Sequence, residues 1–194
     1  HTGNTYSISA NGAGLIPVSA TTVCPEAVQP VITSYNPDAY TDDFGNQLGE
    51  LKFTINDPDL QENYYELQLG TSQAGAENGL IYFNSTDPAL NIQQPFNIGG
   101  GFSGVGHTIF SDQLFNGESR SFTLVIASYQ ADISNGIVLK LSSTDRSFFL
   151  YTQSLMNQQE AEGNPFAEPA PVFNNIENGY GILGSMVVAR DTVF

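Results

Sequence analysis

Apolar and polar side chains alternate with a period of two along the middle of the chain. The alternation is clearest at residues 51–55 and 65–69, where Leu, Phe, Ile and Tyr alternate with Lys, Thr, Glu and Gln. Successive side chains of a strand point to opposite faces, so this pattern is typical of strands with one buried face. Further runs of this kind, each bounded by Gly, Asn, Asp or Pro, are residues 80–83, 107–110, 121–127 and 137–141.

These runs predict a mainly β fold, an antiparallel β-sandwich. The turn residues 56–59 separate the first two runs, which predicts that those two strands are antiparallel neighbours. A second, acidic turn region is predicted at residues 36–46, which hold three aspartates.

One segment departs from the period of two. Residues 145–162 contain no Pro or Gly, and their apolar residues recur at helical spacing. Ser143 or Thr144 is predicted to cap one main α-helix here, with Asp145 in its first turn. We expect the helix to pack on the sandwich through a stripe of apolar and small residues. This stripe consists of Phe148, Thr152, Leu155 and Met156.

Residues 1–26 are set apart from the rest of the chain by the Cys24–Pro25 junction. They are predicted to be extended, either as the remnant of a preceding domain or as edge strands, because they are too few to bury a core of their own. Residues 27–194 are predicted to form the β-sandwich domain. No signal peptide precedes them, so the chain is expected to be a mature or truncated piece.

The prolines at 165 and 169 stiffen residues 164–184 into an ordered crossing that leads into a last strand. Such a crossing requires apolar anchors to offset its ordering entropy. Phe166, Val172, Phe173 and Ile176 are therefore predicted to be substantially buried.

Charge excludes two classes of partner. The chain has 20 acidic and 5 basic residues, a formal net charge of −15. Nucleic acids and anionic lipid surfaces attract clustered Lys and Arg, and the five basic residues here are scattered singly. No apolar run approaches the length of about 18 residues that a membrane-spanning helix requires, so we expect no membrane insertion by this chain itself.

The sequence assigns no catalytic residue and no cofactor site. Residues 99–104 match the pattern G-x-G-x-x-G. A nucleotide-binding fingerprint requires a helix after this loop, but a strand is predicted there, so the match does not indicate a nucleotide site. Cys24 is a single cysteine, and His107 is the one histidine besides the first residue, so neither a Cys-based metal cluster nor a histidine-rich zinc site is expected.

One weak metal candidate lies beside the turn at residues 56–59. Asp57, Asp59 and Glu62 form the densest cluster of oxygen ligands, and such spacing can hold Ca²⁺. The alternative is a turn whose Asp and Asn side chains bond to the backbone.

Four phrases resemble the family called domain of unknown function 4249. They are FTINDPDLQENYY at 53–65, FSDQLFNG at 110–117, LSSTDRSFFLYTQSL at 141–155 and NPFAEPAPVFNNIENGYGILG at 164–184. The resemblance covers the C-terminal part of such proteins. It implies that residues 1–26 are the remnant or edge strands of a preceding immunoglobulin-like domain and its linker.

The resemblance also implies a function. Members look like outer-membrane lipoproteins of Gram-negative bacteria, so we expect a cell-surface protein that is lipid-anchored through a segment not present in this chain. The expected role is a non-enzymatic accessory or ligand-binding lipoprotein whose partner is a TonB-dependent transporter of a nutrient-uptake system. The alternative is a secreted hydrolase or a carbohydrate-binding module, for which the sandwich fold gives fold-level support.

Overall fold

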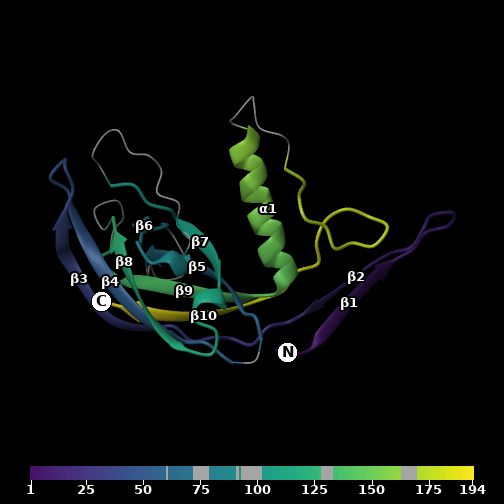
Figure 1. Cartoon of the computed structure of the whole chain (residues 1–194), viewed down its shortest axis with the longest axis horizontal. Helices are drawn as coiled ribbons and strands as arrows, with labels where there is room; N and C mark the ends of the chain where they lie inside the picture. Colours follow the sequence, from purple (N-terminus) through teal and green to yellow (C-terminus); the bar gives the residue numbers. More distant parts are fainter. Residues whose placement is uncertain (60, 72–78, 91, 93–101, 128–132, 163–169) are drawn as a thin grey trace. The chain divides into compact units, whose positions relative to one another are not determined.

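The structure is a computed structural model that describes all residues except 60, 72–78, 91, 93–101, 128–132 and 163–169 (Figure 1). The chain divides into two compact units. The smaller unit comprises His1–Ala27 and Ser143–Val187, and the larger comprises Val28–Ser142 and Val188–Phe194. The prediction that residues 1–26 and 27–194 form separate domains stays a prediction.

The larger unit contains two four-stranded sheets. One has the strand order β3-β4-β8-β6 and the other the order β10-β9-β5-β7. The strands are β3 (Val31–Thr41), β4 (Gln47–Asn56), β5 (Tyr64–Thr71), β6 (Phe83–Asn84), β7 (His107–Ser111), β8 (Ser119–Ile126), β9 (Ile137–Thr144) and β10 (Met186–Val193). Two short 3-10 helices, η1 (Pro88–Leu90) and η2 (Asp112–Leu114), lie in the connections. The predicted mainly β class, an antiparallel sandwich with one main helix, is confirmed.

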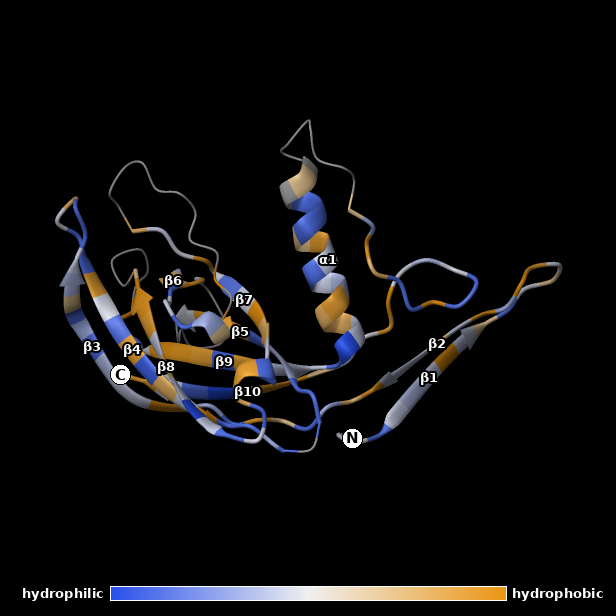
Figure 2. Ribbon diagram, in the orientation of Figure 1, coloured by the Kyte–Doolittle hydropathy of each residue, from blue (hydrophilic) through white to orange (hydrophobic). Residues whose placement is uncertain are grey.

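The predicted alternation forms the core of this unit. Leu51, Phe53 and Ile55 of β4 have no exposed surface, whereas Lys52 between them is exposed. β8 pairs with β4 so that Phe122 lies opposite Phe53. Because every second residue of each strand points inward, the two sheets present matched apolar faces, and Figure 2 shows this alternation as orange and blue bands along β4 and β8.

Aromatic rings connect the two sheets. Phe53 and Phe122 stack with ring centroids 5.1 Å apart within one sheet. Phe110 of β7, in the other sheet, meets the Phe122 ring edge-on at 5.8 Å, and Tyr65 of β5 lies 5.3 Å from Phe110. Edge-to-face and offset pairs of this kind add stability beyond the area that they bury. Phe122 therefore links the two sheets.

The predicted pairing of the strands on either side of residues 56–59 is wrong. β4 and β5 belong to different sheets, so the connection is a corner between sheets and not a hairpin turn. Asp57 fixes the corner, because its buried carboxylate accepts a hydrogen bond from the Tyr65 hydroxyl and another, of 2.9 Å, from the Gly117 amide. Turn residues mark a change of direction, but they do not determine which strand the chain joins next.

The predicted acidic turn at residues 36–46 is too long. β3 continues to Thr41, and the hairpin turn is confined to the residues around Asp42, whose side chain accepts bonds from the amides of Phe44 and Asn46. β3 can include Pro37 because it is an edge strand and because its pairing with β4 shifts register between Asn36 and Tyr40. An edge strand tolerates proline where a ladder hydrogen bond is not required.

Side chains also join the first and last strands of the larger unit. The side-chain amide of Gln29, two residues before β3, donates a hydrogen bond of 2.7 Å to the backbone carbonyl of Arg190. The Ile32 amide donates one of 2.6 Å to the Asp191 carboxylate. β3 and β10 are the edges of different sheets, so these bonds tie one edge of the sandwich together.

The smaller unit is built from the hairpin of β1 (Thr5–Ala10) and β2 (Val18–Val23) and the helix α1 (Arg146–Glu162). The predicted helix is present, but its N-cap is Asp145 and not Ser143 or Thr144, which belong to the end of β9. The Asp145 carboxylate accepts a 2.9 Å bond from the Phe148 amide, as an N-cap does. The same carboxylate accepts bonds from the Thr22 hydroxyl (2.6 Å) and the Ser185 amide (3.2 Å). Asp145 thus joins three segments of this unit.

The apolar stripe predicted for the helix is not fully buried. Phe148, Thr152 and Leu155 are half-buried, and Met156 is exposed. The crossing that follows is bonded to the helix, because the Ser154 hydroxyl accepts a 2.8 Å hydrogen bond from the Phe173 amide.

The anchors predicted for this crossing are only partly buried. Val172, Phe173 and Ile176 are half-buried rather than substantially buried, and Phe166 lies outside the described residues. Order in this segment comes instead from polar contacts: the Asn175 side chain donates to and accepts from the backbone of Leu183, each at 2.9 Å.

We expect Phe122→Ala to lower the free energy of unfolding by about 3–5 kcal/mol, because it removes a fully buried ring from the contact between the sheets. Urea unfolding followed by fluorescence measures the change. Phe44→Ala is the matched control, since Phe44 is 69% exposed and its loss should change stability by less than about 0.5 kcal/mol. Equal effects of the two substitutions would contradict the assignment of the core.

We expect Asp145→Ala to lower the free energy of unfolding by about 2 kcal/mol, the upper end for an N-cap, because three donors lose their acceptor. Far-ultraviolet circular dichroism should show the loss of helix at a lower temperature than in the wild type. Asp43→Ala in the exposed β3–β4 turn is the control and should leave both measurements unchanged. An unchanged helix transition in Asp145→Ala would exclude the capping role.

Candidate functional site

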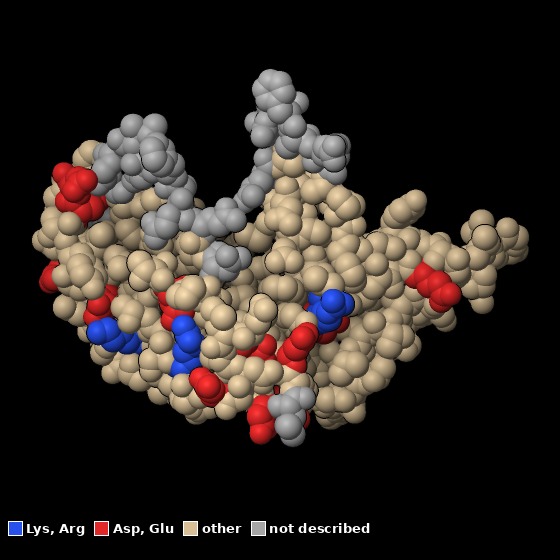
Figure 3. All heavy atoms as spheres, in the orientation of Figure 1, with Lys and Arg blue, Asp and Glu red and all other residues tan. Residues whose placement is uncertain are grey.

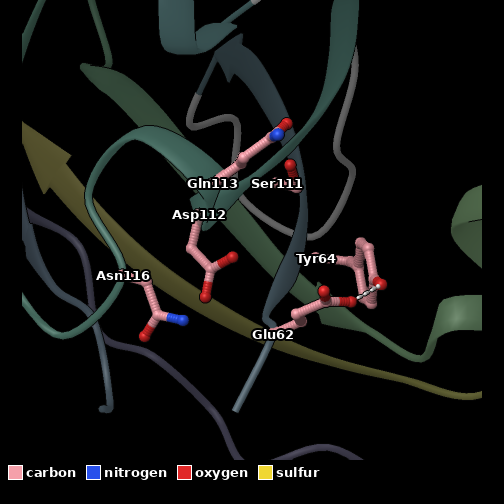
Figure 4. Close-up of a pocket in the computed structure, with 6 residues that line it drawn as sticks. All are labelled: Glu62, Tyr64, Ser111, Asp112, Gln113 and Asn116. Atoms are coloured by element: carbon pink, nitrogen blue, oxygen red, sulfur yellow. Dashed lines mark hydrogen bonds between the residues drawn. The ribbon is translucent and has the colours of Figure 1, made fainter. Parts of the chain in front are cut away.

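The larger unit holds a pocket of about 370 Å³ where β5 begins and β7 ends (Figure 4). Polar side chains line it: Glu62, Tyr64, Ser111, Asp112, Gln113 and Asn116. Glu62 and Tyr64 belong to the entrance of β5, and the others come from the end of β7, from η2 and from the turn after it. The pairing of Tyr64 with Ser111 in the β5–β7 ladder brings these two segments together.

Asp112 lies at the inner wall of the pocket and is 1% exposed. Its carboxylate accepts a 2.8 Å hydrogen bond from the Asn63 amide and a 3.3 Å bond from the Asn63 side chain, while its own amide donates to the Asn63 carbonyl at 3.1 Å. Burial raises the pKa of the Asp112 carboxyl, and the nearby Asp57 carboxylate raises it further, against the lowering effect of the Asn63 donors. Asp112 therefore takes up a proton more readily than an exposed aspartate.

A second buried carboxylate, Asp57, does not line the pocket but lies close enough to Asp112 to raise its pKa. It is 7% exposed and is bonded to the Tyr65 hydroxyl and the Gly117 amide. Burial raises the pKa of the Tyr65 phenol above its ordinary value, and the bond to Asp57 adds to the effect, so Tyr65 stays protonated and donates. This pair supports the corner between β4 and β5.

Glu62 and Tyr64 form the outer wall. The Tyr64 hydroxyl donates a 2.7 Å hydrogen bond to the Glu62 carboxylate, which is the dashed line in Figure 4. Glu62 is exposed and Tyr64 is half-buried. The pocket therefore offers an exposed carboxylate, two hydroxyls and two side-chain amides, a set suited to a polar, neutral or cationic ligand.

The three residues predicted as calcium ligands lie in different environments. Asp57 is buried at the corner, Asp59 is exposed in the turn beyond it, and Glu62 lies in the wall of the pocket. Within the described part of the chain, no group of three or more His, Cys, Asp or Glu side chains is placed to hold a metal ion. The calcium hypothesis stays untested, while the alternative is seen at Asp57, whose side chain bonds to the backbone of Gly117.

Sequence reasoning did not single out Asp112 or its neighbours Ser111, Gln113 and Asn116. They belong to the phrase FSDQLFNG, which carried a family resemblance but no role. One local pattern in the sequence could have indicated the short helix η2, because Ser-Asp at the end of an apolar strand is typical of the start of a helix. The partner Asn63 lies 49 residues away and could not be paired with Asp112 from the pattern.

The glycine-rich motif at residues 99–104 falls partly outside the described residues, which exclude 93–101. A strand, β7, follows it, as predicted. His107, the first residue of β7, is exposed and lies opposite Gln68 of β5.

Acidic side chains are spread over the visible face in Figure 3, with fewer basic ones among them. Ion pairs among the described residues of the larger unit include Lys52–Glu50 at 2.9 Å and Arg120–Asp87 at 2.7 Å. Among the helices that the structure describes, none has the length and hydropathy to cross a membrane.

Comparison with known proteins gives one match. A family model described as Domain of unknown function (DUF4249) matches residues 1–192. No curated protein matches the chain, and no solved structure does.

Asp112 should make stability depend on pH in a defined direction. Because its folded-state pKa is raised above the ordinary 3.8, the folded protein binds this proton more tightly than the unfolded chain. The contribution of Asp112 to the free energy of unfolding is therefore greatest below pH 3.8 and falls as the pH rises through the raised pKa. The wild type should lose stability relative to Asp112→Asn over this window, measured by urea unfolding from pH 3.5 to 7.

Glu50→Gln supplies a control of opposite sign. Hydrogen bonds from Tyr40 and Lys52 lower the pKa of Glu50, so its contribution is present above the ordinary pKa of 4.5 and is lost as the pH falls through the lowered value. The wild type should gain stability relative to Glu50→Gln as the pH rises. A flat difference between wild type and Asp112→Asn would show that Asp112 is not desolvated in the folded state.

Proposed function

The chain belongs to the DUF4249 family, and on that premise we propose that it is a non-enzymatic, ligand-binding or accessory lipoprotein of the outer membrane. In this proposal it is lipid-anchored through a segment outside the present chain. It works with a TonB-dependent transporter and presents a nutrient to it. The support is the family resemblance, together with a pocket suited to binding.

One observation carries the binding role: the carboxylates of the pocket are held by donors of the protein itself. Asp112 is bonded twice by Asn63, and Glu62 is bonded by Tyr64. These hydrogen bonds fix the orientation of each carboxylate, and a carboxylate held in this way can still accept a hydrogen bond from a ligand. Side chains fixed in this way recognise a ligand at low cost in entropy.

The size and polarity of the pocket indicate the class of ligand. About 370 Å³ is within the range of small-molecule sites. Its hydroxyls, amides and carboxylates bond to polar groups, and a net charge of −15 disfavours anions. A small neutral or cationic polar solute, such as a sugar or an amino compound, fits this chemistry.

A second candidate is a secreted hydrolase or a carbohydrate-binding module. Two carboxyl groups, those of Glu62 and Asp112, line the same pocket, and the raised pKa of Asp112 is the direction required of a general acid. Tyr64 adds an aromatic ring to the same wall. These features favour the hydrolase only if both carboxyl groups take part in turnover.

Affinity purification of the full-length protein from its native host tests the first candidate. Recovery of a TonB-dependent transporter in stoichiometric amount is the expected result. Recovery of the protein alone, under conditions in which a known lipoprotein–transporter pair of the same host stays together, would count against it.

Pocket variants separate binding from turnover. A panel of mono- and disaccharides and amino acids, screened by thermal shift, should yield a ligand that the wild type binds without chemical change. Asn116→Ala should weaken that affinity about tenfold, the effect of one lost hydrogen bond of about 1.4 kcal/mol. Asn46→Ala in the β3–β4 turn is a matched control and should leave the affinity unchanged. Turnover of a glycan or peptide library that is lost in both Glu62→Gln and Asp112→Asn would replace the binding role with the hydrolase.

A further inference from the structure

The outer strand of the β1–β2 hairpin is exposed along its whole length. All six residues of β1 are exposed, whereas β2 contains the buried residues Ala20 and Thr22. On its other side β2 is covered, because Ser19 forms a bridge with Glu177 and the Asn178 side chain donates to the carbonyl of Pro17. Among the residues that the structure describes, none pairs with the outer side of β1, so the free edge of this two-stranded sheet is that of β1.

The hydrogen-bonding direction of β1 follows from its register. The Cys24 amide donates to the carbonyl of Asn4, so Asn4 turns its backbone groups toward the β2 side. In an antiparallel ladder this direction alternates from residue to residue. The backbone groups of Thr5, Ser7 and Ser9 therefore point away from β2, toward the open edge.

β1 lacks the devices that protect edge strands. Thr5–Ala10 contain no Lys and no Pro, and six consecutive residues pair with β2 without a register shift. Bulges, prolines and lysines are the usual means of preventing edge pairing. An unprotected edge of this kind accepts another extended strand.

The distribution of charge in the chain indicates which kind of strand could pair with the open edge of β1. Residues 1–25 contain no Asp, Glu, Lys or Arg, although the whole chain carries a formal charge of −15. Figure 3 correspondingly shows neither red nor blue at the tip of the hairpin, where Leu15 and Ile16 are 73% and 74% exposed. Two copies of so acidic a chain repel one another over much of their surface. The two strands of this hairpin carry no charged side chain, and the Glu177 carboxylate that bonds to the hairpin does so at Ser19, on the β2 side.

We propose that β1 is the contact of a symmetric dimer, in which β1 of a second copy pairs antiparallel with it. A two-fold axis perpendicular to the sheet keeps equivalent faces together, and it passes through Ser7, the centre of the outward-facing residues Thr5, Ser7 and Ser9. Ser7 then lies opposite the second copy's Ser7, and Tyr6 opposite the second copy's Ile8. An aromatic side chain beside a β-branched one is a favourable cross-strand pair. The result is one four-stranded sheet in place of two two-stranded sheets.

Light scattering after size-exclusion chromatography tests the dimer with a matched pair of variants. The wild type should approach twice the mass of one chain at about 100 µM, since a contact of this size is a weak one. Ser7→Lys places two like charges on the axis and should weaken dimerisation about tenfold. Thr21→Lys adds the same charge on the same face and removes the same Ser7–Thr21 hydrogen bond of 3.0 Å, but it lies on the inner strand and should leave the dimer intact.

Cysteine cross-linking tests the register. In a Cys24→Ser background, which removes the free thiol, Ser7→Cys should form a disulfide-linked dimer under mild oxidation, because opposed residues of an antiparallel pair are within disulfide reach. Ser9→Cys is the control: its copies would be about 13 Å apart, four residues along the ladder, and should not cross-link. A monomer at all concentrations, equal effects of Ser7→Lys and Thr21→Lys, or equal cross-linking of the two cysteines would overturn the proposal.

Discussion

The edge-to-face contact between Phe110 and Phe122 holds together the two sheets of the larger unit. Each ring belongs to a different sheet, and each is also in contact with a ring of its own sheet, Tyr65 or Phe53. Phe115, at the end of η2, lies 5.7 Å from Phe122 and 6.3 Å from Phe110, so the turn that borders the pocket rests on the same cluster. The position of the pocket walls thus depends on the packing of the core.

Carboxylates define the border between this core and the surface. Asp57 and Asp112 are both buried, in a chain with an excess of acidic residues, and both are satisfied by hydrogen bonds from neighbouring backbone amides. Burying a carboxylate without such donors is costly, so each one fixes the loop that supplies its donors. This arrangement gives the pocket a polar wall whose side chains are held in place by hydrogen bonds.

The smaller unit is stabilised differently. Among its described residues, the buried ones are Ala20, Thr22, Ser143 and Thr144, a set too small for an apolar core. Polar contacts replace that core, with Asp145 joining the helix, β2 and the segment before β10. A unit of this kind leaves apolar side chains such as Tyr6 and Ile8 at its surface. The dimer that we propose forms through the open strand edge of this unit.

The sequence by itself determined the fold class, the helix, the place of most strands and the core residues of β4 and β5. Those properties are local, since a period of two or of 3.6 is written into neighbouring residues. It also carried the family resemblance. It did not determine that β4 and β5 lie in different sheets, that Asp145 caps the helix, or that Asp112 lines a pocket with Glu62. Asp112 is paired with Asn63, 49 residues away, and Asp145 with Thr22, 123 residues away. Only the tertiary structure decided these pairs, because strand order within a sheet, and hence which distant side chains meet, depends on how whole faces pack and not on any local pattern.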